Sequence, residues 1–430
     1  MDWQSIYAGR LTTAAEAVKV IRPGDTVVVA HACGEPQALT GAMVARAAEL
    51  HDVEVVHMVA MGKALYCQPE MQGHFRHNSL FVGATSRQAV KEGRADYTPC
   101  FFSEIPRLFQ EGYLPVDVAL VHVSPPDEHG YCSLGISVDY TKPAAECART
   151  VIAQVNRNMP RTLGESFMHV SQFHHVVEVD EPLIELPRPE ISRTEENIGR
   201  HCAELIEDGS TLQLGIGAIP DAVLSFLKDK RDLGIHTEMF SDGVVELCEA
   251  GVITNQAKTL HRGKMVATFF MGTNKLYRFI NDNPLVAMYP VDYVNNPFII
   301  SQNYKMVSIN SALQVDLSGQ VGADTIGVTQ YSGVGGQVDF VRGSSRSPGG
   351  KSIIAMPSTA GGGRFSRVVP VLDPGTGVTT SRNDVHYVVT EYGIACLRGK
   401  TLRQRAAALI AVAHPDFRAD LEKAARERNW

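Results

Sequence analysis

Short apolar runs alternate with segments of helical periodicity along the whole chain. The runs at 53–60 and 116–123, and later at 265–272 and 352–358, have the length and β-branched content of buried strands. Helical segments separate them in both halves of the chain. Strands that alternate with helices in this way form largely parallel sheets. The pattern therefore predicts an α/β fold.

The hydrophobic pattern also repeats between the two halves. Residues 12–39 and 194–223 each open with a threonine suited to cap a helix, carry apolar residues at helical spacing, and turn at Gly24 or Gly209. A short strand, a glycine-bearing loop and a proline follow in each, and proline fits the first turn of a next helix. Both segments predict the order helix, strand, loop, helix, and together they indicate two similar α/β domains.

The segment 181–190, EPLIELPRPE, is the predicted linker, because it combines three prolines and acidic residues with no clear period. It divides the chain into an N-terminal domain, 1–185, and a C-terminal domain, 190–430. A chain of 430 residues is long enough for two or three domains, each with a large core. In such folds the site lies at the carboxyl ends of strands, in the crevice between layers or domains, and we expect it at the domain interface.

Composition excludes several classes of protein. The formal charge of −7, without basic blocks, argues against a nucleic-acid partner. Apolar runs stay shorter than the roughly 18 to 20 residues of a membrane span, and the first residues do not resemble a secretory signal. Eight cysteines without a CxxC pair indicate scattered reduced thiols. We expect a cytoplasmic protein with no membrane partner.

Two pairs of residues have the spacing of metal ligands. His74 and His77 lie three apart, as do His129 and Cys132, but neither pair has a second pair at matching spacing. Histidines of surface loops explain them better, so no metal site is predicted.

The segment Gly234–Gly243, GIHTEMFSDG, contains the most informative candidate. Glu238 closes a short apolar run and a turn follows at once, while glycine loops lie upstream at 215–220 and downstream at 332–337. A carboxylate beside loops that present bare backbone N–H groups suits covalent acyl chemistry. By its spacing alone, Glu238 fits better as a surface acid that caps the turn with Ser241 and Asp242.

GIGAIP, at 215–220, also resembles the start of a dinucleotide-binding loop, with Glu238 about where a ribose-binding acid is expected. Pro220, however, stands where the third glycine of that motif allows close packing of helix on strand. This alternative is therefore the weaker one. No phosphate-binding GxxxxGK[ST] loop exists, and GESFM at 164–168 lacks the last glycine of a serine-hydrolase elbow.

The chain resembles the acetyl-CoA hydrolase/transferase family over essentially its whole length. It is most similar to the 4-hydroxybutyrate and butyrate:acetate branch of these class I CoA-transferases. The segments that carry the resemblance are 123–141, 151–166, 215–223, 236–243, 269–280, 332–340, 390–401 and 413–418. Together these motifs are highly specific, whereas either glycine loop alone would be a weak signal.

The resemblance implies a CoA-transferase with Glu238 as its nucleophile and a glutamyl-CoA thioester as intermediate. Coenzyme A or acyl-CoA is then a substrate, small carboxylic acids are the other partners, and no prosthetic group is needed. It also assigns CoA and oxyanion contacts to two sets of residues. These are Gln213, Leu214, Gly215, Ile216 and Gly217 in the first loop, and Gly333, Gly335 and Gly336 in the second.

Other assignments stay open at this stage. Arg364, Arg367 and Lys400 are candidates for the CoA phosphates, although solvated surface charge explains each of them better. Residues 31–36 occupy the place that matches GIGAIP and are a weaker candidate for the acid pocket. An acyl-CoA hydrolase that uses the same glutamate and a non-catalytic CoA- or nucleotide-binding protein are the alternatives. The family suggests a homodimer or a higher homo-oligomer.

Overall fold

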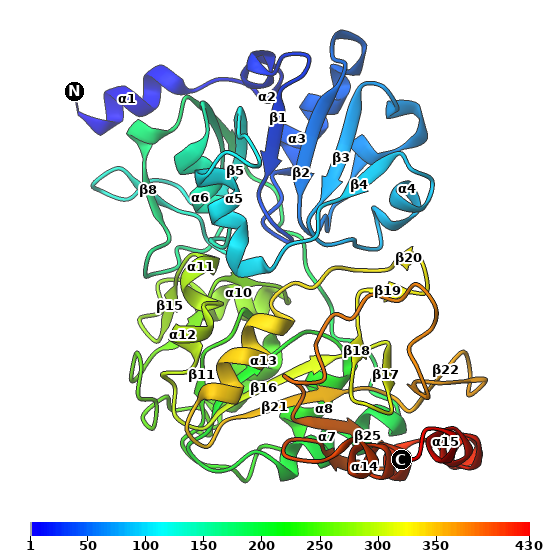
Figure 1. The fold of residues 1–430 in the computed structure, drawn as a ribbon. Coiled ribbons are helices and arrows are strands. Elements are labelled where there is room, and N and C mark those ends of the chain that lie inside the picture. Colours follow the sequence, from blue (N-terminus) through cyan, green and yellow to red (C-terminus); the bar gives the residue numbers. More distant parts are fainter. Residues whose placement is uncertain (1) are drawn as a thin grey trace. The chain divides into compact units, whose positions relative to one another are not determined.

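A computed structural model describes residues 2–430 of the chain (Figure 1). It contains two compact units: the first comprises Met1–Leu186 and Val266–Val294, and the second comprises Pro187–Met265 and Asn295–Trp430. The segment Val266–Val294 thus groups with the first unit, whereas the sequence-based division placed it in the second domain. Its backbone explains this, since Phe270 N donates to Ile136 O at 2.9 Å and Met288 N to Leu163 O at 2.8 Å. Such pairings over long sequence separations leave no local signal.

The first unit is built on a seven-stranded sheet in which every neighbouring pair is parallel. In spatial order its strands are β4 (Ala95–Tyr97), β3 (Phe75–Ser79), β2 (Val53–His57), β1 (Thr26–Val29), β5 (Val118–Val123), β7 (Thr150–Asn156) and β9 (His175–Val179). The predicted strands at 53–60 and 116–123 correspond to β2 and β5. Their continuous apolar character reflects burial on both faces.

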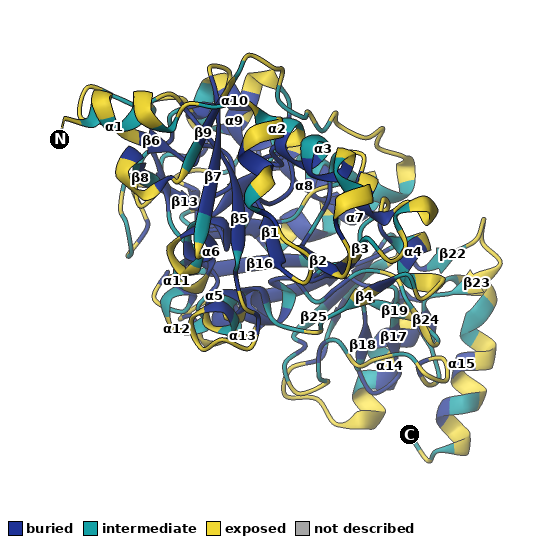
Figure 2. Ribbon diagram, turned by 90° about the horizontal axis from the view of Figure 1, so that it is seen from above, coloured by how far each residue is buried: buried dark blue, intermediate teal, exposed yellow. Residues whose placement is uncertain are grey.

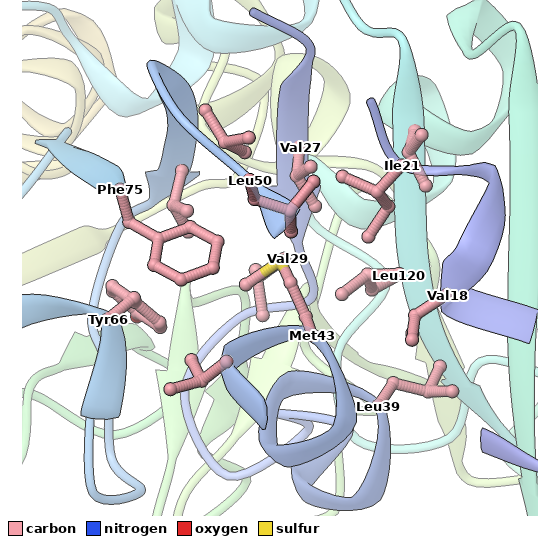
Figure 3. Close-up of a cluster of buried hydrophobic side chains, with 14 of the residues drawn as sticks. Val18, Ile21, Val27, Val29, Leu39, Met43, Leu50, Tyr66, Phe75 and Leu120 are labelled. Carbon is pink, nitrogen blue, oxygen red and sulfur yellow. The ribbon is translucent and has the colours of Figure 1, made fainter. Parts of the chain in front are cut away.

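Eight helices belong to the described part of the first unit, and α3 (Gln37–Ala45) supplies apolar residues that cover the sheet. The other seven are α1 (Trp3–Arg10), α2 (Ala14–Ala17), α4 (Arg87–Lys91), α5 (Ile105–Gln110), α6 (Thr141–Cys147), α10 (Asn274–Ile280) and α11 (Val291–Val294). Leu39 and Met43, four residues apart on one face of α3, pack into a cluster with Val27 and Val29 of β1 (Figure 3). This cluster is the core beneath the end of β1, where the loop 31–36 begins.

The second unit has a six-stranded sheet that is parallel except for its last strand. The strands, in spatial order, are β11 (Gly234–Ile235), β10 (Thr211–Leu214), β16 (Met306–Ser311), β21 (Lys351–Ala355), β25 (Tyr387–Thr390) and β26 (Gly393–Cys396), which runs antiparallel to β25. The predicted α/β fold with largely parallel sheets is confirmed. Figure 2 shows the inner strands of the sheets as buried and the helices as exposed on their outer sides.

Eleven further elements complete the parts of the second unit used below. The helices are α7 (Arg193–Glu204), α8 (Ala218–Ser225), α9 (Asp242–Glu249), α12 (Pro297–Ile300), α13 (Gln337–Arg346), α14 (Leu402–Val412) and α15 (Pro415–Glu427). The short strands are β12 (Met239–Phe240), β19 (Thr325–Ile326), β20 (Thr329–Gln330) and β23 (Phe365–Ser366). None of the helices formed by residues 2–430 combines the length and the apolar character needed to span a bilayer.

Both predicted repeats have the order helix, strand, loop, helix: α2, β1 and α3 in the first unit, and α7, β10 and α8 in the second. The helix caps differ from the prediction by one or two residues. The side chain of Thr13 caps α2, and Ser192 forms a capping box with Glu195 at the start of α7. A residue with extended backbone directly before the helix is what a cap requires, and Thr194 already lies inside α7.

The packing of α7 on α8 depends on Gly199. A Cβ atom at this position would lie 2.7 Å from the carbonyl carbon of Ala222, which is backbone and cannot move aside. Gly41 in α3 offers a matched helical control, because a Cβ there would meet nothing within 4 Å.

We expect Gly199→Ala to lower the free energy of unfolding by about 1 to 3 kcal/mol, because overpacking outweighs the gain in helix propensity. Gly41→Ala should instead raise it by roughly 0.5 to 1 kcal/mol. Urea unfolding of both variants measures the difference. Equal and positive effects would show that α7 and α8 do not pack this closely.

Candidate active site

Glu238 lies in a bend between β11 and β12, and its side chain is half-buried. The preceding residues fix this bend to the neighbouring strand β10. His236 N donates to Leu212 O at 3.2 Å, and the Thr237 hydroxyl lies 2.8 Å from Met239 O and 3.2 Å from Leu214 O. The bend that holds Glu238 is therefore attached to the end of β10, where the first glycine loop begins.

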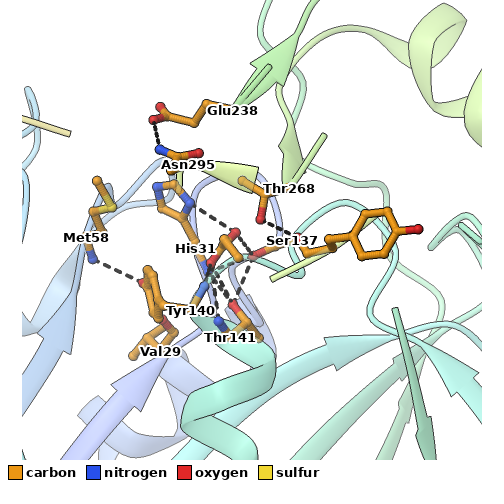
Figure 4. A network of polar contacts seen from close by, with 11 residues as sticks. Val29, His31, Met58, Ser137, Tyr140, Thr141, Glu238, Thr268 and Asn295 are labelled. Atoms are coloured by element: carbon orange, nitrogen blue, oxygen red, sulfur yellow. Dashed lines mark hydrogen bonds and ion pairs between the residues drawn. The ribbon is translucent and has the colours of Figure 1, made fainter. Parts of the chain in front are cut away.

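Asn295 holds the Glu238 carboxylate directly. Its Nδ2 donates to Oε2 of Glu238 at 2.9 Å, as Figure 4 shows. The Asn295 side chain is fully buried, and its Oδ1 has no hydrogen-bond partner among the described residues. Sequence reasoning missed this residue. The Asn295-Asn296-Pro297 run signals a helix start, and Asn296, which accepts from Phe298 N at 2.9 Å, accounts for that signal by itself.

The second glycine loop lies against the same carboxylate. A Cβ atom on Gly336 would lie 2.0 Å from Glu238 Oε2 and 2.3 Å from Asn295 Nδ2, so no other residue fits there without displacing them. Gly335 has a φ of 55°, in the left-handed region that glycine adopts readily. Gly336 immediately precedes α13, whose N-terminal end favours negative charge at this point.

The first glycine loop is placed differently from the second. Gln213 and Leu214 belong to β10 and are buried, and Gln213 Oε1 accepts from Asn310 Nδ2 of β16 at 3.2 Å. Gly215, Ile216 and Gly217 form the loop before α8, with Gly217 at a φ of 114°. Of the predicted residues, Glu238 and Gly336 lie against each other, and Leu214 O accepts a hydrogen bond from Thr237, the neighbour of Glu238. The Gln213 side chain is instead engaged with β16.

Side chains close the outer edge of β11, just before Glu238. Leu233 pairs with backbone, since Leu233 N donates to Val252 O and Thr254 N donates to Leu233 O, each at 3.0 Å. At Ile235 side chains replace a strand: Asn255 Oδ1 accepts from Ile235 N at 2.9 Å, and Lys258 Nζ donates to Ile235 O at 2.7 Å. The outward backbone groups of this edge strand are thereby satisfied up to three residues before Glu238.

Lys258 performs this task while buried. Its Nζ also donates to Lys264 O at 2.7 Å, and burial lowers its pKa to about 7. Gly234 leaves room for the lysine stem, because a Cβ there would lie 2.4 Å from Lys258 Cγ. This contact explains the first glycine of the GIHTEMFSDG segment.

A cavity of about 720 Å³ in the second unit contains two of the three predicted cationic candidates. Arg364 and Arg367 line it together with Tyr331 and Phe365, and Tyr331 lies two residues before Gly333. Arg367 donates to Ala312 O at 3.0 Å, its Nε is buried without a partner among the described residues, and burial lowers its pKa. Lys400 does not line this cavity.

The loop 31–36 of the first unit is built around buried polar groups. His31 Nδ1 lies 3.2 Å from Asp139 Oδ2, and Ser137 Oγ donates to the same carboxylate at 2.9 Å (Figure 4). The Glu35 carboxylate accepts from Gly62 N at 2.9 Å, and burial raises its pKa. Polar contacts thus hold this loop at the end of β1, the position that GIGAIP occupies after β10.

His74 and His77, which have the spacing of metal ligands, each lie within hydrogen-bond distance of a backbone carbonyl oxygen. His74 Nδ1 lies 2.8 Å from Leu50 O, and His77 Nδ1 lies 3.0 Å from Val55 O. Across residues 2–430 the structure gathers no group of three His, Cys, Asp or Glu side chains able to hold a metal ion.

The chain belongs to the acetyl-CoA hydrolase/transferase family. Residues 1–186 match the N-terminal domain of that family and residues 272–425 its C-terminal domain. The chain is 62% identical to the 4-hydroxybutyrate coenzyme A transferase of Clostridium kluyveri, with 100% of each chain covered. It is 39% identical to the butyryl-CoA:acetate CoA-transferase of Anaerostipes caccae, over 99% of this chain and 98% of that one.

Among solved structures, the chain is similar to the 4-hydroxybutyrate CoA-transferase of Porphyromonas gingivalis. The two are 48% identical and superpose with a TM-score of 0.87, covering 99% of this chain and 100% of the other.

The low pKa of Lys258 makes stability depend on pH. The unfolded lysine, with a pKa near 10.5, binds more protons than the folded one between pH 7 and 10.5. This group therefore makes the folded state more stable as pH rises through that window, by about 1 kcal/mol per unit, and adds no pH dependence below it, where the lysine is protonated in both states. In Lys258→Met this contribution is absent.

Urea unfolding at pH 6 to 9.5 measures the effect. We expect Lys258→Met to be less stable than the wild type, because two carbonyls lose their donor, with a deficit that grows above pH 7. Lys423→Met, which removes an exposed lysine of α15, is the matched control. A deficit independent of pH would contradict a neutral buried amine.

Proposed function

We propose that the protein is a CoA-transferase that moves CoA between an acyl-CoA and a small carboxylic acid, with Glu238 as its nucleophile. The observation that carries this proposal is the position of the Glu238 carboxylate. It receives a hydrogen bond from the Asn295 amide and lies against the bare α-carbon of Gly336, at the N-terminal end of α13. The names of the family relatives support the same activity.

The chemistry needs no energy source beyond the thioester. Glu238 attacks the acyl carbonyl, expels CoA thiolate and forms a mixed anhydride. The thiolate then attacks the glutamyl carbonyl, the acid leaves, and Glu238 carries CoA as a thioester. A second carboxylate reverses both steps and departs as the new acyl-CoA. Each bond broken is matched by one of similar kind, so neither ATP nor a prosthetic group is required.

Each addition to a carbonyl places negative charge on an oxygen atom. Preorganised donors at such an oxyanion lower the barrier by about 3 to 4 kcal/mol for a single donor. The positive end of α13 and the backbone of the two glycine loops supply such donors. The Asn295 amide donates a hydrogen bond to Oε2 and is thereby suited to orient the Glu238 carboxylate toward the thioester.

The nucleotide end of CoA fits the cavity of about 720 Å³ beside the second glycine loop. Tyr331 and Phe365 offer aromatic surface for the adenine, while Arg364 and Arg367 offer charge for the phosphates. An anion here would also compensate the half-buried Arg367 guanidinium. This arrangement leaves the thiol end of CoA to reach Glu238 along the loop that contains Gly333, Gly335 and Gly336.

The acid partner belongs to the class of 4-hydroxybutyrate, butyrate, acetate and itaconate. The relatives act on such acids according to their names, and the loop 31–36 is our candidate for part of the acid pocket. We propose a cytoplasmic homo-oligomer. Hydrolysis of acyl-CoA at the same glutamate is the competing activity, favoured if water reaches the glutamyl thioester before the acid does.

Incubation with acyl-CoA alone should add the mass of CoA to Glu238, and hydroxylamine should remove it. Glu238→Gln should show no adduct and lose more than 1,000-fold in turnover, because amide nitrogen cannot replace the carboxylate nucleophile. Glu249→Gln, on α9, is the control with the same change of charge. An adduct that persists in Glu238→Gln would refute the assignment, and free thiol without an acceptor acid would identify a hydrolase.

Gly336→Ala should lower kcat by roughly 100-fold while the protein stays folded, because the added methyl displaces the nucleophile by the order of 1 Å. Gly9→Ala is the control, since a Cβ at Gly9 meets nothing within 4 Å. Steady-state kinetics together with a thermal unfolding curve separate loss of geometry from loss of fold. Unchanged turnover would show that Glu238 is not held against Gly336 during catalysis.

A further inference from the structure

A second cavity of the second unit, of about 280 Å³, is lined by four arginines. Arg342 and Arg346 come from the last turns of α13, Arg398 follows β26, and Arg405 belongs to α14. Because β26 runs antiparallel to β25, Arg398 returns to the edge where β21 and β25 begin. We refer to this cavity as the arginine pocket.

Arginines outnumber carboxylates among the residues that line the arginine pocket. Asp384 is the one carboxylate among the lining residues, and its Oδ2 lies 3.4 Å from Arg342 Nε. Arg346, Arg398 and Arg405 form no ion pair with a carboxylate within the described residues. Three of the four arginines are exposed, so solvent screens part of their mutual repulsion, and an anion that joined them would relieve the remainder.

Two groups that line the pocket have lowered pKa values, chiefly because they are buried. Burial lowers the pKa of His386, which lines the pocket, to about 4, and the charges of Arg398 and Lys351 add to the shift. Burial also lowers the pKa of Arg405, with repulsion from Arg382 as the second cause.

Backbone carbonyls hold two of the arginines in place. Arg398 Nη2 donates to Ser345 O at 3.0 Å, and Arg405 Nη1 donates to Arg382 O at 2.6 Å and to Ser318 O at 3.2 Å. Cations near a helix C-terminus have an ordinary role, since they satisfy its last carbonyl groups. Arg398 fulfils that role at Ser345, whereas the guanidinium of Arg346, in the last turn of α13, lies over the Phe298 ring at 5.7 Å from its centroid.

The arginine pocket is distinct from the site at Glu238. The N-terminus of α13 begins beside Gly336 and Glu238, whereas its C-terminus supplies Arg342 and Arg346 to the pocket. A helix of 10 residues spans about 15 Å. The two places are therefore at opposite ends of one rigid element.

We propose that the arginine pocket binds the dianionic phosphate group of a small phosphorylated metabolite. Guanidinium groups pair with phosphate oxygens in a planar, bidentate manner, and several at fixed positions favour a dianion over a monoanion. The volume admits a phosphate ester of a few carbon atoms, but it is small for a nucleotide. Phosphate bound here adds negative charge at the C-terminal end of α13, the helix whose N-terminal end lies beside Glu238.

Isothermal titration calorimetry at low ionic strength, in a cationic buffer, tests this site with inorganic phosphate and pyrophosphate as probes. Arg346→Gln/Arg398→Gln should weaken binding by at least about tenfold, because two charge-assisted contacts are lost. Arg76→Gln/Arg107→Gln, at two exposed arginines of the first unit, changes the net charge equally and should retain wild-type affinity. If the double variant is unstable, Arg346→Gln alone should still weaken binding several-fold.

Arg364→Gln distinguishes this pocket from the proposed CoA cavity. Phosphate binding that persists in Arg364→Gln and is lost in the arginine-pocket variants supports the proposal. Binding that is lost in Arg364→Gln alone places the probe in the CoA cavity and overturns it. Absence of saturable binding, or equal losses in the arginine-pocket variant and the charge-matched control, also overturns it. None of these outcomes depends on whether Glu238 is the nucleophile.

Discussion

The arrangement of the candidate site depends on one close contact, between the Glu238 carboxylate and the α-carbon of Gly336. Glu238 Oε2 lies where a side chain on Gly336 would have to begin, and Asn295 occupies the remaining space beside it. The three residues come from segments far apart in the chain, and each is positioned by a different element. The sheet, α12 and α13 must therefore all be in place before this arrangement exists.

The surrounding structure suits that demand. Register between β10 and β11 sets the height of the Glu238 bend, and the Thr237 hydroxyl ties the bend to the end of β10. On the other side of β11, Asn255 and Lys258 hold both backbone groups of Ile235. The Glu238 side chain therefore extends from a backbone that is fixed from two directions.

Periodicity and turn chemistry were enough to predict the α/β fold and the helix, strand, loop, helix order of both repeats. They were enough because these signals are local: apolar spacing, a glycine turn and a helix cap within a few residues. The predicted helix caps, Thr12 and Thr194, differ by one and two positions from the observed caps, Thr13 and Ser192. Several polar residues in each stretch are equally suitable as caps.

Features that depend on distant pairing were not predicted. The segment Val266–Val294 reads as ordinary strand and helix, and only its hydrogen bonds to residues such as Ile136 and Leu163 assign it to the first unit. Asn295 was missed for the same reason, because its role is defined by a glutamate 57 positions away. Glu238 is proposed as the nucleophile because of the family resemblance, whereas its spacing alone favours a surface acid that caps the turn.

The side-chain closure of β11 has a consequence for the behaviour of the molecule in a crowded solution. An edge strand with unpaired N–H and C=O groups is a template on which another chain can add a strand and begin to aggregate. Asn255 and Lys258 occupy those groups at Ile235 without extending the sheet, so β11 presents no further ladder to a neighbour. The strand that leads to Glu238 is therefore an edge strand whose outward backbone groups at Ile235 are already hydrogen-bonded.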